Sequence, residues 1–145
     1  ITDSYYLKKN DEIKVSKKSK NKILKWDRFN FKLNRSMEVF KGPEFDLLSS
    51  NSKNKLFKNE FTISTNNRMA YNLVEKLQVG TKSIVSSPVL PGSVQLTPSG
   101  KMIILHRDCQ TTGGYPRILQ LNISSLNYLS QLKSTDKIKL RLINL

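Results

Sequence analysis

The chain has 145 residues, 37% of them hydrophobic, with one cysteine, one histidine and a formal net charge of +14. This length fits one domain, no run approaches the roughly 20 apolar residues of a membrane-spanning helix, and one cysteine excludes an internal disulfide. The positive charge alone would fit a nucleic-acid-binding protein, but the excess is shared evenly between residues 1–60 and 61–145, which argues against a localised footprint.

Residues 1–35 form a basic N-terminal segment, which we expect to be part of the same domain or its linker. Its densest charge lies between Lys17 and Lys25, among Ser and Asn residues, and predicts an exposed loop outside any active pocket. The chain starts at Ile1 without a signal-peptide pattern, and we expect it to be an excerpt of a longer protein. The single cysteine favours a reducing, cytoplasmic setting.

Beyond this segment, short apolar runs separated by turn residues predict strands rather than helices. In chain order, strands are expected in parts of 24–33 and at 37–40, 57–63, 69–74, 92–96, 102–105 and 137–142. The turn Thr97–Gly100 would join two of them in a hairpin. Two short helices are expected, over 44–50 and 125–132, the second capped by Ser124 or Ser125. The predicted fold class is mainly β, most simply a barrel with one or two short helices.

Metal and nucleophile chemistry find little support in the sequence. With His106 and Cys109 as the only histidine and cysteine, no metal-ligand spacing exists. On an extended strand these two side chains would point to opposite faces, which disfavours a Cys–His dyad. The chain also lacks a phosphate-binding loop of the Gly-x4-Gly-Lys-Ser/Thr kind.

Three polar segments are the candidate sites. The longest is 108–117, where Gly113 and Gly114 allow positive φ and close approach of a ligand. The alternative is an ordinary Gly-Gly hairpin turn with polar neighbours. In the segment 89–96, Ser93 and Gln95 project from one face of a strand. In 66–71, Arg68 could bind a carboxylate or phosphate, the alternative being a surface ion pair.

Taken in order, these segments resemble the motifs of the KipA-like family, also called allophanate hydrolase subunit 2 or the C subunit of 5-oxoprolinase. Asn67–Tyr71 is similar to its D-R-M-G-x-R block, Pro91–Gln95 to P-G-S-I-Q-V, and Asp108–Ile118 to A-D-x-Q-T-T-G-G-Y-P-K-I. The match covers about residues 36–142, assigned as the C-terminal part of the domain. His106-Arg107 stands where the family usually has small or apolar residues, and Asn67 replaces an aspartate, so this copy gains positive groups and loses an acid.

The resemblance implies a cyclophilin-like β-barrel that works with a KipI-like partner, also called the B subunit of 5-oxoprolinase or allophanate hydrolase subunit 1. It implies one subunit of an ATP-dependent 5-oxoprolinase, or of a urea carboxylase-type carboxyltransferase. The alternative is a regulatory protein that binds a KipI-like kinase inhibitor without catalysis. ATP would act through the complex, and biotin would arrive on another chain. Because family members are longer, the missing N-terminal half is a further expected partner, and the chain alone is expected to be inactive or to self-associate.

The resemblance also implies roles for individual residues. Asp108 and Gln110 are the catalytic candidates. Substrate binding is assigned to Arg68, Ser93, Gln95, Thr111, Thr112, Gly113, Gly114, Tyr115 and Arg117. Within this set, Arg68 or Arg117 would pair with an anionic group, and backbone amides near Gly113 would polarise the substrate carbonyl.

Overall fold

The computed structural model describes residues 36–78 and 83–144. The predictions for the basic segment 1–35, including its exposed loop and its strand, lie outside these residues.

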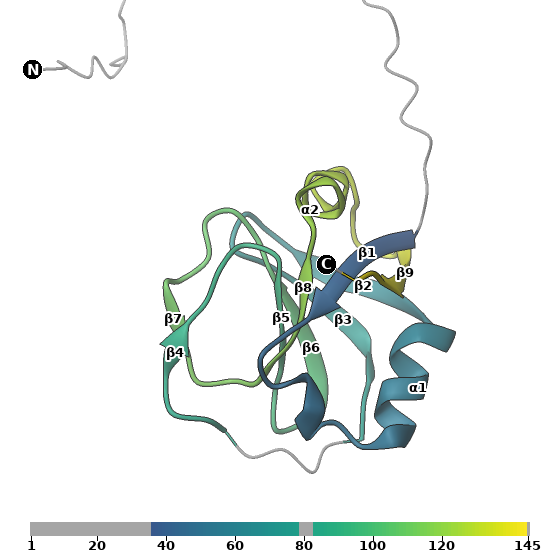
Figure 1. Ribbon diagram of the computed structural model, residues 1–145. Helices are drawn as coiled ribbons and strands as arrows, with labels where there is room; N and C mark the ends of the chain where they lie inside the picture. The colour runs from purple at the N-terminus through teal and green to yellow at the C-terminus, as the bar shows by residue number, and fades with distance from the viewer. Residues whose placement is uncertain (1–35, 79–82, 145) are drawn as a thin grey trace, which may run out of the picture. The chain divides into compact units, whose positions relative to one another are not determined.

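Seven strands form a closed barrel in the order β1-β8-β5-β6-β3-β2-β9, with β9 pairing back onto β1 (Figure 1). They are β1 (Ser36–Lys41), β2 (Glu60–Asn66), β3 (Ala70–Lys76), β5 (Ser93–Leu96), β6 (Lys101–Leu105), β8 (Arg117–Leu121) and β9 (Lys137–Leu142). The pair β1 and β9 is parallel, and the other neighbours in the barrel are antiparallel. The prediction of a mainly β barrel with short helices is confirmed.

Alternating apolar residues fill the barrel. In β1, Met37 and Val39 are fully buried, and in β9 Ile138 and Leu140 are buried in the same way, while their neighbours on each strand face outward. This period of two is the pattern of a strand with one face on a core. The hydrophobic cluster continues from these strands through β2, β3, β5, β6 and β8.

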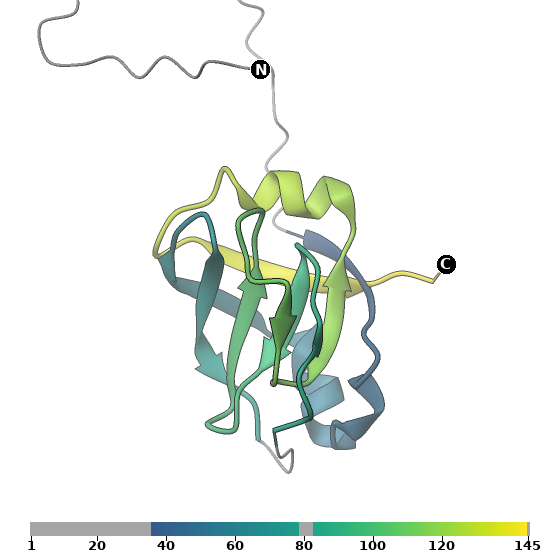
Figure 2. The same ribbon diagram turned by 90° about the vertical axis from the view of Figure 1, so that its left-hand side faces the viewer.

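Strand β5 is buried on both faces. Val94 and Leu96 join the core, whereas Ser93 and Gln95 point the other way and are still only 4% and 1% exposed. A small two-stranded ribbon of β4 (Ser87–Pro88) and β7 (Thr112–Gly113) lies outside the barrel and accounts for part of this burial (Figures 1 and 2). The prediction that Ser93 and Gln95 share one face of a strand is confirmed.

Two α-helices lie at opposite ends of the barrel (Figures 1 and 2). Helix α1 (Ser50–Lys58) begins after Ser49, whose hydroxyl accepts a hydrogen bond from the Ser52 amide at 3.2 Å, and it buries Leu56. Helix α2 (Ile123–Leu129) buries Leu126 and Leu129. Neither is long and apolar enough to cross a membrane, and the same holds for every helix in the described part of the chain.

Several predicted boundaries are corrected. Phe57 belongs to α1, so the strand predicted from 57 begins at Glu60, and the helix predicted over 44–50 is a single 3-10 turn, η1 (Phe45–Leu47). Helix α2 is capped by Asn122, whose side chain accepts from the Ser125 amide at 2.8 Å. The predicted caps Ser124 and Ser125 both lie inside the helix, and the Ser125 hydroxyl accepts a hydrogen bond from the amide of Glu38 in β1.

Candidate functional site

Two of the three candidate segments meet where β3 begins and β6 ends. The amide of His106 donates to the carbonyl of Met69 at 2.8 Å, and the amide of Asp108 donates to the carbonyl of Arg68 at 3.0 Å. Asn67 shapes the turn before β3, because its side-chain oxygen accepts from the amides of Met69 and Ala70 at 2.8 and 2.9 Å. Segments 40 residues apart are thus held in register.

Arg68 and Asp108 form a bidentate ion pair at this junction. The Arg68 Nε donates to Asp108 Oδ2 at 2.6 Å, and Nη2 donates to Oδ1 at 3.3 Å. The side chains are 85% and 44% exposed, so solvent and a ligand can reach both. Hydrogen bonding from Arg68 holds the pKa of Asp108 below its ordinary value. Asp108 is therefore an ionised acceptor at neutral pH.

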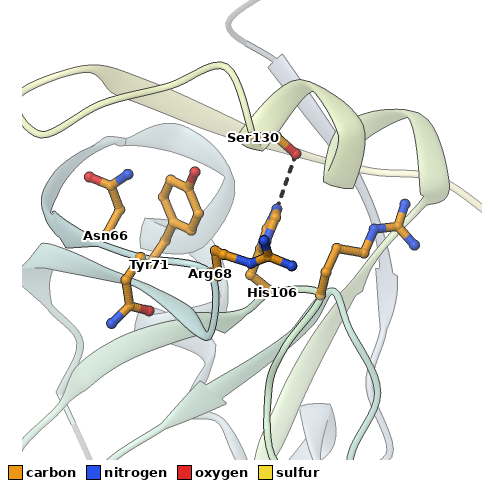
Figure 3. A pocket seen from close by; sticks show the side chains of 7 residues that line it. Asn66, Arg68, Tyr71, His106 and Ser130 are labelled. Atoms are coloured by element: carbon orange, nitrogen blue, oxygen red, sulfur yellow. Dashed lines mark hydrogen bonds between the residues drawn. The ribbon is translucent and has the colours of Figure 1, made fainter. Parts of the chain in front are cut away.

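A pocket of about 410 Å³ opens beside Arg68, and Asp108 lies next to it without lining it (Figure 3). Its wall consists of Asn66, Asn67, Arg68, Tyr71, His106, Arg107 and Ser130. Tyr71 and His106 are almost completely buried, with ring centroids 5.4 Å apart. His106 Nε2 lies 3.1 Å from the Ser130 hydroxyl at the end of α2, the dashed line in Figure 3.

His106 is a neutral part of the pocket wall. Burial lowers the pKa of its imidazole below the ordinary value, and the positive charge of Arg107 acts in the same direction. The Cys–His dyad gains no support, because burial raises the pKa of the Cys109 thiol, whereas an activated cysteine needs a lowered one. Among the described residues no group of three or more His, Cys, Asp and Glu side chains could hold a metal ion.

The glycine-rich residues form the outer ribbon rather than a hairpin turn. Thr112 and Gly113 pair with β4, and the amide of Ile84 donates to the carbonyl of Gly114 at 3.0 Å. Neither glycine uses the positive φ that its missing side chain allows, which among the described glycines occurs at Gly92 and Gly100. Gly113 does permit a close approach, since a Cβ there would lie 2.6 Å from the Nε2 atom of buried Gln95.

The polar neighbours of these glycines are accessible. Gln110, Thr111, Thr112 and Tyr115 are exposed. The Gln95 side chain lies beneath them and donates to the carbonyl of Tyr115 at 3.3 Å. The predicted role of backbone amides near Gly113 in polarising a carbonyl stays a prediction.

The Arg117 side chain is already hydrogen-bonded within the protein. Its Nε and Nη2 donate to the two carboxylate oxygens of Glu44 at 3.0 and 2.7 Å, and Nη1 donates to the carbonyl of Pro88 at 2.7 Å. With Ser93, it borders a second cavity of about 170 Å³. The Ser93 hydroxyl donates to Gln120 Oε1 at 2.9 Å.

The predicted site residues therefore fall into three neighbourhoods: the Arg68–Asp108 junction, the ribbon, and the Arg117–Glu44 pair. Of the seven pocket residues, only Arg68 was assigned a role from the sequence, although Asn66, Asn67 and Tyr71 lie in the same candidate segment, 66–71. His106, Arg107 and Ser130 were not predicted as wall residues. No local spacing links Ser130 to the others, whereas the unusual pair His106-Arg107 was a usable signal.

A match to the carboxyltransferase domain family, subdomains A and B, spans residues 3–142. The chain belongs to this family. It is 34% identical to the C subunit of 5-oxoprolinase from Escherichia coli (strain K12) over 94 residues, which are 63% of this chain and 30% of that protein. It is also 34% identical to the C subunit of 5-oxoprolinase from Haemophilus influenzae over 105 residues, 70% of this chain and 34% of that protein.

This carboxyltransferase-family chain thus spans about a third of the length of the curated relatives it matches. Among solved structures, the urea carboxylase of Kluyveromyces lactis superposes with a TM-score of 0.70 at 17% identity, covering 75% of this chain and 11% of that one. At this identity the likeness concerns the fold. The barrel is therefore a carboxyltransferase-domain barrel, and its sequence relatives are subunits of an enzyme complex.

Proposed function

We propose that this chain contributes one wall of the substrate site in an amide-processing enzyme, in the role of a 5-oxoprolinase C-type subunit. The observation that carries the proposal is the exposed, ionised carboxylate of Asp108, held by Arg68 beside an open pocket. The sequence likeness to the C subunit of 5-oxoprolinase supports a small cyclic amide as the substrate class.

Asp108 would act as an acceptor for the substrate's amide N–H. A carboxylate that remains ionised accepts hydrogen bonds but supplies no proton, so general acid catalysis must come from another group. Arg68 is a positioning residue in this account, because its fork fixes both oxygens of the carboxylate. The exposed Gln110 side chain can add a donor to the substrate carbonyl.

The opposing catalytic groups would come from other parts of the complex. The described residues around Asp108 offer a neutral imidazole and a thiol with a raised pKa, which leaves the site without a ready acid. A KipI-like subunit and the additional length of the family's proteins are the proposed sources. ATP would be handled by the complex, and biotin, in a carboxyl-transfer version of the reaction, would arrive on another chain. A cytoplasmic location fits these partners.

The test is reconstitution of the chain with the KipI-like partner and with the additional segment that the longer relatives have. We expect ATP hydrolysis that depends on 5-oxoproline, with the 145-residue chain alone inactive. Biotin-dependent carboxyl transfer to urea would support the amide-processing role with a different substrate. A stable complex with neither activity would contradict the proposal and would favour the non-catalytic regulatory role.

A further inference from the structure

Asp108 lies on a tight turn that directly follows β6. The amide of Cys109 donates to the carbonyl of His106 at 3.1 Å, which closes the turn and leaves Arg107 and Asp108 at its exposed tip. The ion-pair partner Arg68 lies on another turn, the one before β3. The bidentate pair therefore fixes the carboxylate relative to a second exposed turn rather than to the packed part of the barrel.

Helix α2 is the packed element next to the Asp108 turn. Its residues Asn127 and Ser130 are three positions apart, so they lie side by side on the helix surface. The Nη2 of Arg107 donates to the side-chain oxygen of Asn127 at 2.7 Å. His106 Nε2 lies 3.1 Å from the Ser130 hydroxyl (Figure 3). The turn is thus tied to α2 through the two residues that precede Asp108.

Helix α2 is itself fixed to the barrel. Leu126 and Leu129 belong to the hydrophobic core and are 3% and 0% exposed. In the first turn of the helix, the Ser125 hydroxyl accepts from the amide of Glu38 in β1 at 2.8 Å. The Asn122 side chain donates to the Glu38 carboxylate at 2.7 Å. A side chain that is bonded to α2 is therefore bonded to the core of the protein.

The contact between Arg107 and Asn127 is suited to a local role. Both side chains are exposed, and the substitution of exposed residues usually changes the free energy of unfolding by no more than about 0.5 kcal/mol. Position is a more sensitive quantity, because a displacement of about 1 Å can lower the rate of a catalysed reaction by roughly a hundredfold. Without this contact, the turn would keep the Arg68–Asp108 pair and lose one of its two side-chain links to α2.

We infer that Arg107 is a positioning residue, which together with Asn127 fixes the turn carrying Asp108 against helix α2. The inference rests on the proposed function, because it assigns to Arg107 the placement of the carboxylate that meets the substrate. Arg107 contacts no reacting atom in this role. Asn127 does not line the pocket described above, so an effect of its substitution on turnover would pass through Arg107.

The first measurement is the NMR order parameter of the Asp108 amide in the full 145-residue chain. The wild type should show a value of about 0.85, typical of rigid backbone, and Asn127→Ala and Arg107→Met should lower it towards about 0.6. Arg107→Lys should keep the wild-type value. The observed contact uses a single guanidinium nitrogen, and a lysine ammonium supplies a charged donor on a long stem.

Asn51→Ala is the matched control for Asn127→Ala. Asn51 also makes an exposed side-chain hydrogen bond, to Gln78 at 3.1 Å, but it lies on α1 at the other end of the barrel (Figures 1 and 2). The order parameter of the Asp108 amide should not change in this variant. Melting temperatures of all these variants should match that of the wild type, which would separate a local effect from a loss of the fold.

The second measurement is turnover of the reconstituted complex with 5-oxoproline and ATP. Asn127→Ala should lower kcat by about tenfold and leave KM within about twofold, the pattern expected when a catalytic group is misplaced and ground-state binding is kept. Arg107→Met should lose the same amount. The double variant should lose no more than either single variant, because both substitutions remove one and the same contact.

Any of four results would overturn the inference. They are an unchanged Asp108 order parameter in Asn127→Ala, an equal change in Asn51→Ala, full kcat of Asn127→Ala in an active complex, or a rise in KM for Arg107→Met that Asn127→Ala does not share. The last result would make Arg107 a substrate contact. A wild-type complex without turnover would instead remove the proposed function, and the order parameters would still decide whether Arg107 fixes the turn.

Discussion

The carboxylate of Glu44 binds Arg117 at three donors: the backbone amide of Arg117 and two nitrogens of its guanidinium, at 2.7 to 3.0 Å. The side chains are 17% and 19% exposed, and the pair joins residues 73 positions apart. It ties the segment after β1 to the start of β8, two neighbouring barrel strands. The finding gives Arg117 a structural role. Its contact with substrate stays a prediction.

Glu44→Gln should destabilise the protein by about 1–2 kcal/mol, because Arg117 keeps its charge and loses the carboxylate. Asp46→Asn is the control. Asp46 pairs with Lys53 at 3.1 Å but is 88% exposed, so its loss should cost less than about 0.5 kcal/mol. Urea unfolding at neutral pH measures both. Equal effects of the two substitutions would contradict the structural role of the Glu44 pair.

The same pair should contribute to acid sensitivity. Hydrogen bonding from Arg117 lowers the pKa of Glu44 in the folded state. The stabilisation is therefore complete above the unfolded pKa, about 4.3, and is lost as pH falls through the folded pKa. Glu44→Gln should show a smaller loss of stability than the wild type over this interval.

A second pH effect is expected at milder acidity, from the only histidine. Burial lowers the folded pKa of His106, so the unfolded chain takes up its proton first. Stability should be complete above about pH 6.5 and should fall as pH decreases towards the folded pKa. His106→Gln, which keeps a side-chain amide near Ser130, should abolish the part of the decline in urea-unfolding stability that begins just below about pH 6.5. A decline of the same size in the variant would assign it to other groups.

Adjacent glycines should respond differently to a methyl group. In Gly113→Ala the Cβ would lie 2.6 Å from Nε2 of Gln95, which is 1% exposed and cannot move into solvent. We expect a loss of about 1–3 kcal/mol. In Gly114→Ala the nearest atom would be 3.5 Å away, and the change should stay within about 0.5 kcal/mol. Thermal unfolding of the two variants, if equal, would contradict the close packing of the ribbon on β5.

Sequence patterns predicted the half-buried strands well. Strand β9 was placed at its observed bounds because Ile138 and Leu140 alternate with charged residues, and the β5–β6 hairpin followed from the turn at Gly100. Strand β8 was missed. Its adjacent residues Ile118 and Leu119 are both fully buried, so no alternation marks it. Such a run can be recognised only when both faces of the strand are known to be covered.

Helix α1 was missed for a different reason. It is rich in Ser, Asn and Lys, and Leu56 is its one fully buried apolar residue, so the period of a helix is hard to detect. The candidate site, like the fold, was predicted only in part. Arg68 and Asp108 were both predicted, yet the pocket beside them depends on Arg107 and Ser130, which only the barrel brings together.

The central claim, that Asp108 serves in catalysis by an amide-processing complex, is tested by one comparison. Turnover with 5-oxoproline and ATP is measured for the reconstituted complex with Asp108→Asn and with Gln110→Ala, beside pull-down of the KipI-like partner. We predict that both variants lose most of their turnover while partner binding and thermal unfolding stay unchanged, since Asp108 and Gln110 are exposed. Full turnover in Asp108→Asn, or loss of the complex itself, would contradict the account.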